Sequence, residues 1–194
     1  MEKVTSFFLA LALLVLGAAL PLRAETKEKL PPPAASERPA DKAQAKIAEA
    51  KRCYNETTQR FDPLCTIPIY HEASKILRGA GIPVEETPHL YWTIFEGLGL
   101  AFLERGDFEE ARKMFQTAGA IQKVPDKARE ESAYNLGITQ YQLGEKDQAI
   151  HTFEVLFQRN SDWLTRGEGD PNLSRLRETK EWKELATRLK ATKP

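Results

Sequence analysis

The chain has 194 residues, with 28 lysines and arginines against 28 aspartates and glutamates, so its formal net charge is zero. This balance gives no concentrated positive field of the kind that nucleic-acid binding needs, and we expect no nucleic-acid partner. Hydrophobic residues make up 41% of the chain, which is enough for one domain with its own core.

Residues 1–24 have the pattern of a secretory signal peptide. Lys3 supplies a positive charge, residues 7–20 form an uninterrupted apolar run, and the segment ends on the small residue Ala24. The run is shorter than the roughly 20 residues that span a bilayer, so we predict cleavage after Ala24, with an uncleaved anchor as the alternative. The mature protein is then expected in the periplasm or outside the cell, without a stable membrane span.

Residues 25–42 are expected to form a flexible linker. The segment is rich in proline, charged and small residues, and it contains Pro31, Pro32, Pro33 and Pro39. It offers too little apolar surface to offset the entropy of ordering it.

Residues 43–86 are expected to form a first helical hairpin. Alanine-rich sequence around Ile47 favours a helix, which should end near Phe61 because Asp62-Pro63 disfavours its continuation. The partner helix should then run from Pro68 to Arg78.

The two cysteines, Cys53 and Cys65, both fall in this first hairpin. An even pair in an exported chain favours a disulfide. Free thiols are an alternative. A metal site with His71 as a third ligand is another, although this spacing matches no standard zinc motif.

A helical signature recurs at an interval of 38 residues over residues 87–160. The repeated positions are Leu98 and Leu136, Gly99 and Gly137, Gly106 and Gly144, Ala111 and Ala149, and Phe115 and Phe153. Counting back by the same interval reaches Ala73, Leu77 and Ala80 in the first hairpin. A fixed interval of this size predicts stacked helical hairpins, whose usual product is a binding surface.

Each hairpin of residues 87–160 has predictable limits. The second should begin at Pro88 and turn at Gly106, and the third should begin after Pro125 and turn at Gly144. We expect the small residues of the two helices to meet, Gly99 against Ala111 and Gly137 against Ala149. Phe115 and Phe153 should fill the space between neighbouring hairpins.

These residues resemble the tetratricopeptide repeat. The resemblance covers residues 88–158 well and residues 43–80 only through the second helix. Phe95 stands where the family usually has Trp, and the interval of 38 exceeds the family's usual 34. The resemblance implies an all-α fold, a right-handed solenoid of about three hairpins closed by a C-terminal pair of capping helices.

Residues 161–194 are expected to form that cap. A polar loop with Gly167 and Gly169 should lead into a short helix from Asp170 and a last helix from Thr179. Trp182 and the leucines around it would cover the open end of the stack.

The resemblance also implies that the first helix of each hairpin lines a concave protein-binding groove. The positions that map to it are Glu96, Leu100, Leu103, Glu131, Tyr134, Asn135, Ile138 and Tyr141; for Leu100 and Ile138 the alternative is packing between hairpins. We expect the rings of Tyr134 and Tyr141 to be exposed as anchors for a partner. Glu96 and Glu131 would favour a partner segment with basic residues.

The chain carries no catalytic, phosphate-binding or metal-binding motif, and its three histidines lie in separate hairpins. We therefore predict a non-enzymatic protein without cofactor or metal. The expected function is a periplasmic scaffold or adaptor that binds a protein or peptide segment, within an assembly of the cell envelope or a secretion complex. The alternative is a chaperone-like subunit that holds an exported or unfolded client.

Overall fold

The computed structural model describes residues 38–55 and 60–191; the predicted signal peptide and most of the predicted linker lie outside this part of the chain. The described residues form the helices α1 (Pro39–Lys51), α2 (Pro63–Gly79), α3 (Pro88–Arg105), α4 (Phe108–Ala120), α5 (Asp126–Gln142), α6 (Lys146–Arg159), α7 (Asp162–Gly169), α8 (Ser174–Arg177) and α9 (Lys180–Ala191), with the short strands β1 (Tyr54–Asn55) and β2 (Arg60–Phe61) and the 3-10 turn η1 (Pro171–Leu173). The all-α fold class is confirmed.

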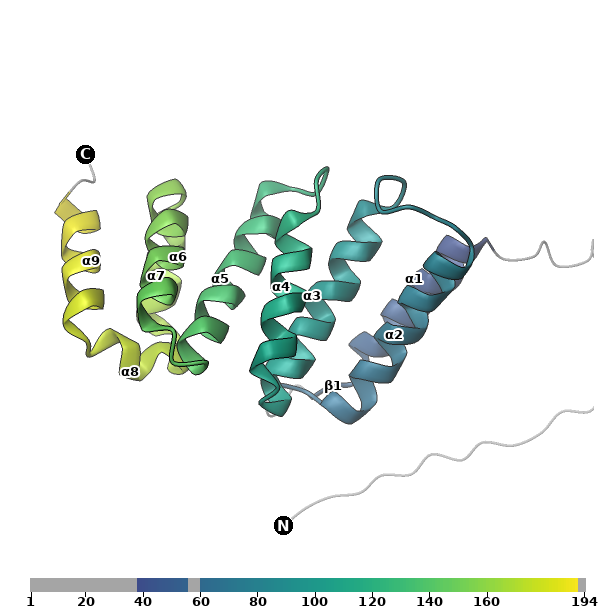
Figure 1. Cartoon of the computed structure of the whole chain (residues 1–194), viewed down its shortest axis with the longest axis horizontal. Coiled ribbons are helices and arrows are strands. Elements are labelled where there is room, and N and C mark those ends of the chain that lie inside the picture. Colours follow the sequence, from purple (N-terminus) through teal and green to yellow (C-terminus); the bar gives the residue numbers. More distant parts are fainter. Residues whose placement is uncertain (1–37, 56–59, 192–194) are drawn as a thin grey trace, which may run out of the picture. The chain divides into compact units, whose positions relative to one another are not determined.

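Helices α1 to α6 form three antiparallel hairpins that stack in chain order (Figure 1). The turns at Gly106 and Gly144 have φ of 84° and 81°, which explains why glycine stands at both. Helix α3 contacts α1 and α5 as well as its neighbours in sequence, so the first helices of the hairpins form one layer. We call the side of the stack formed by α1, α3 and α5 the first-helix face.

Both helices of the first hairpin differ from the prediction: α1 is shorter and α2 is longer. Helix α1 begins at Pro39, inside the predicted linker, and ends at Lys51 rather than near Phe61. A two-stranded antiparallel hairpin follows, in which Tyr54 pairs with Phe61. Helix α2 begins at Pro63 rather than Pro68, because the side chain of Asp62 accepts a hydrogen bond from the backbone N–H of Leu64 and caps the helix there.

The predicted disulfide is present. Cys53 follows α1 and Cys65 lies in the first turn of α2, with their Cα atoms 5.9 Å apart. The bond closes the loop that carries β1 and β2, so neither sulfur is left as a free thiol or a metal ligand.

The atoms nearest to the repeat glycines Gly99 and Gly137 belong to aromatic rings, a contact that we did not predict. A Cβ atom on Gly99 would lie 2.5 Å from the ring of Phe115, and one on Gly137 would lie 2.7 Å from the ring of Phe153. Each phenylalanine therefore packs against the glycine of its own hairpin, and Phe153 also contacts Trp182 of α9, outside that hairpin. Ala111 and Ala149 are fully buried.

The C-terminal segment contains one helix more than predicted. The expected polar loop is helix α7, whose buried face consists of Trp163, Leu164 and Gly167. Trp182 of α9 packs over Phe153 and Phe157 of α6, with centroid distances of 5.5 Å and 5.7 Å. Helices α7 and α9 together cover the end of the stack.

The buried apolar side chains form two clusters. One joins α1 to α4 with the loop after α4, and the other joins α5 to α9. Leu103 of α3 packs against both clusters. Among the helices of the described residues, none is long and apolar enough to cross a membrane.

Candidate functional site

The residues predicted to line the groove divide into two groups in the structure. Four are buried and four are half-buried. The buried residues are Glu96, Tyr134, Asn135 and Ile138. The half-buried residues are Leu100, Leu103, Glu131 and Tyr141.

Tyr134 is a core residue, so the prediction that its ring is exposed was wrong. Its relative exposure is 0%, and its ring lies between Phe153 and Trp163, with centroid distances of 5.6 Å and 5.2 Å. The hydroxyl donates a hydrogen bond to Oδ2 of Asp170 at 2.8 Å. Burial, aided by this contact with a carboxylate, raises the pKa of Tyr134. Helix α7 covers the position that we expected a partner to occupy.

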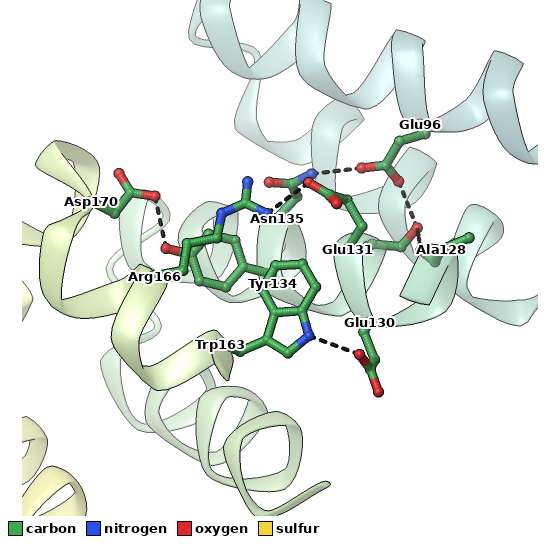
Figure 2. A network of polar contacts seen from close by, with 10 residues as sticks. Glu96, Ala128, Glu130, Glu131, Tyr134, Asn135, Trp163, Arg166 and Asp170 are labelled. Atoms are coloured by element: carbon green, nitrogen blue, oxygen red, sulfur yellow. Dashed lines mark hydrogen bonds and ion pairs between the residues drawn. The ribbon is translucent and has the colours of Figure 1, made fainter. Parts of the chain in front are cut away.

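Glu96 is also buried, at the joint between α3 and α5 (Figure 2). Its two carboxyl oxygens accept hydrogen bonds from Oγ of Ser132 and Nδ2 of Asn135, each at 2.6 Å. Ser132 in turn accepts a hydrogen bond from Nε1 of Trp92 at 3.0 Å. Burial raises the pKa of Glu96 to about 7, although the two hydrogen bonds act in the opposite direction.

Arg166 fastens α7 to the first-helix face, as Figure 2 shows. Its guanidinium lies 4.6 Å from the ring centroid of Tyr134 and 4.9 Å from that of Trp163. It also donates to Oε1 of Glu131 at 2.9 Å. The guanidinium of Arg166 thus holds α7 through an ion pair and through stacking on two rings.

A second contact holds the start of α7. Nε1 of Trp163 donates to Oε2 of Glu130 at 2.8 Å, and Nδ2 of Asn160 donates to the same oxygen at 3.1 Å. Trp163 and Arg166 were not among the residues predicted for the site. The sequence does carry a signal for helix α7: the pair Trp163-Leu164 is followed three residues later by Gly167, which is the spacing of a buried helical face.

The acidic residues of the face are already paired within the chain. Glu131 pairs with Arg166, and Glu104 pairs with Arg60 of β2 at 3.6 Å. Glu96 is buried. These carboxylates offer no free charge, so the predicted preference for a basic partner loses its structural basis.

Three partly exposed apolar side chains of α3 and α5 make up what we call the apolar strip of the first-helix face. It consists of the half-buried side chains of Leu100, Leu103 and Tyr141. Leu103 and Tyr141 stand 38 residues apart, at the same position of successive repeats. Glu104 and Gln142, the next residue in each repeat, are exposed beside them. The strip can contact apolar side chains of another protein while its margin stays polar.

Comparison with protein families matches residues 92–159 to the tetratricopeptide repeat. The match begins in α3 and ends with α6, so it covers the second and third hairpins. Residues 92–159 therefore form tetratricopeptide repeats. No curated protein and no solved structure matches the chain. Tetratricopeptide repeats are typically non-catalytic scaffolds for protein–protein interaction, and this part of the chain has the stacked hairpins that such a role requires.

Proposed function

We propose that this protein is an exported scaffold or adaptor that binds a segment of another protein on its first-helix face, at the strip formed by Leu100, Leu103 and Tyr141. The observation that carries the proposal is the half-buried state of these apolar side chains on a repeat built for protein contacts. Tyr141 supplies an amphipathic ring of the kind that recurs in interface hot spots.

Two further features support export. The sequence of residues 1–24 is typical of a signal peptide, and Cys53–Cys65 is a bond that persists in oxidising compartments. In a bacterium that compartment is the periplasm, where a scaffold for an envelope or secretion assembly would act. Amino-terminal sequencing of the mature protein should find Glu25 as its first residue.

Site-specific photo-crosslinking in living cells tests the surface. A photoreactive residue at Gln142, exposed beside Tyr141, should crosslink to a partner protein. The same residue at Lys75, exposed on α2, is the matched control and should not. A single stoichiometric product identifies an adaptor, whereas a mixed set of products identifies a chaperone-like subunit. Products at Lys75 and none at Gln142 would place the partner on another face.

A further inference from the structure

A cleft of about 790 Å³ opens between the second helices α4 and α6, with α5 as its floor. Its volume falls within the range of roughly 300–1,000 Å³ that is usual for binding pockets. The cleft lies where the two apolar clusters meet, because its α4 wall belongs to the first cluster and its floor, α5, belongs to the second. Neither the strip on the first-helix face nor any residue that we predicted for the groove lines it.

Gly119 keeps the α4 wall of this cleft open. Unlike Gly99 or Gly137, it has no steric need to be glycine: the nearest atom to an added Cβ is Cβ of Ser132 at 3.8 Å, an ordinary contact. Its φ is not positive either. Glycine inside a helix costs about 1 kcal/mol relative to alanine. What the missing side chain provides at this position is the free space of the cleft.

Apolar side chains lie at the centre of the cleft. Leu136 of α5 is half-buried, and Val155 of α6 is 44% exposed. Ala133 and Gly119 leave room beside them. A large apolar side chain of a ligand would therefore contact Leu136 on the floor and Val155 on the α6 wall, with space left beside Ala133 and Gly119.

Unused hydrogen-bond donors flank this centre. His151 and Arg159 lie on α6 four residues to either side of Val155, so the three share one side of the helix. Neither side chain has a hydrogen bond or ion pair within the part of the chain that the structure describes. The acidic groups of the lining are engaged: Asp126 with Arg129, and Glu130 with α7. The cleft therefore calls for acceptors on its ligand.

We propose that this cleft binds a short acidic segment of a partner protein, which inserts a large apolar side chain against Leu136 and Val155 and places carboxylates on Arg159 and His151. The two donors stand eight residues apart on one helix, so the carboxylates would be spaced by roughly 12 Å. This is a second docking surface, on helices other than those of the first-helix face. An adaptor with two such surfaces can hold two segments at once.

Selection from a randomised peptide library displayed on phage, with the full mature chain as bait, tests the proposal. The enriched peptides should combine aspartate or glutamate with a large apolar residue. Gly119→Leu fills the cleft and should weaken binding of a selected peptide, measured by calorimetry, by about tenfold or more. Arg159→Glu reverses a charge at the exposed rim and should weaken it by about tenfold.

Gly79→Leu is the matched control, because Gly79 ends α2 and an added Cβ there meets no atom within 4 Å. It should leave peptide binding unchanged, and so should Tyr141→Ala, which tests the other surface. The proposal is overturned if no peptide is enriched, if the enriched peptides are basic, or if Gly119→Leu and Arg159→Glu both bind normally. It is also overturned if sedimentation shows a dimer that Gly119→Leu dissociates, because the occupant is then a second copy of the chain.

Discussion

Glu96 is a buried carboxyl whose neighbours can satisfy it in either protonation state. When it is ionised, the carboxylate accepts hydrogen bonds from Ser132 and Asn135. When it is protonated, it can donate a hydrogen bond to Oγ of Ser132. The hydroxyl of Ser132 then donates its own hydrogen bond to the carbonyl oxygen of Ala128, which lies 3.3 Å away. The charged groups facing it are Glu131, which raises its pKa, and Arg166, which lowers it.

This arrangement predicts a pH-dependent stability. Burial raises the pKa of Glu96 from 4.5 to about 7, so between these values the folded state keeps a proton that the unfolded chain has lost. The free energy of unfolding should therefore fall as pH rises through this window, by about 3 kcal/mol. Glu96→Gln cannot ionise, and urea denaturation at a series of pH values should show a flatter profile that lies above the wild type at about pH 8. Identical profiles for the two proteins would contradict the assignment.

Gly99 gives a second prediction at this scale. Gly99→Ala should destabilise the protein by about 1–3 kcal/mol, because the new Cβ overlaps the ring of Phe115. Gly119→Ala adds the same atom to a helix where it meets only an ordinary contact, and it should be neutral or stabilising by up to about 1 kcal/mol. Chemical denaturation of both variants checks the contrast, and a shift in the same direction for both would refute it.

The interval of 38 residues predicts which residues repeat, but it does not predict which side chains each of them contacts. The interval of 38 located Gly99 and Phe115, but a spacing along two helices does not say which turn of one faces which turn of the other, so it did not predict that the ring of Phe115 lies nearest to the glycine. Tyr134 failed for a different reason. Its position in the repeat is a groove position, and only the unpredicted helix α7 makes it a core residue.

The β1–β2 hairpin is the element that the disulfide controls. Replacing both Cys53 and Cys65 with serine should lower the free energy of unfolding by about 3 kcal/mol, because the bond closes a loop with a sequence separation of 12. Helical content should persist, since the second and third hairpins do not depend on it. Thermal melts followed by circular dichroism measure both effects. An unchanged melting temperature would show that the loop is held by other contacts.

The two tyrosines of α5 are predicted to differ, because helix α7 covers Tyr134, whereas Tyr141 is only half-buried. Tyr134→Ala should cost about 3–5 kcal/mol, because it empties a fully buried site between Phe153 and Trp163. Tyr141→Ala, at a half-buried site, should cost much less and act on partner binding instead. Denaturation and crosslinking of the single variants separate the two roles. Equal losses of stability would mean that Tyr141 is also a core residue.

The β1–β2 hairpin and helix α7 were not predicted from the sequence, and the reason is the same for both. Helix α1 ends at Lys51 because the chain turns back to form the disulfide-closed hairpin, and a two-residue strand leaves no periodic pattern to detect. Helix α7 is short, with two glycines and only one pair of large apolar residues. Both owe their shape to tertiary contacts rather than to local propensity.

At the scale of the stack, the joint between the second and third hairpins has two unlike sides. On the first-helix face, the polar network of Glu96, Ser132 and Asn135 ties α3 to α5. On the other side the second helices leave a cleft. Ser132 belongs to both, since it donates to Glu96 and also lines the cleft. Ser132 is fully buried, so a ligand in the cleft would lie next to the network that joins α3 to α5 without replacing any of its hydrogen bonds.

The C-terminal cap should decide whether the stack folds as a soluble monomer. A chain ended at Asn160 loses Trp163 and Trp182, the rings that cover Tyr134, Phe153 and Phe157. Removal of a buried tryptophan typically costs about 3–5 kcal/mol, so the loss of two approaches the total of about 5–15 kcal/mol that stabilises a domain. We expect the shortened chain to bind a hydrophobic dye and to self-associate, as measured by fluorescence and analytical ultracentrifugation. A chain ended at Ala191, which keeps α9, should behave like the full-length protein. If the chain ended at Asn160 stayed monomeric with an unchanged melt, α7 to α9 would be an appendage and not the cap of the repeat.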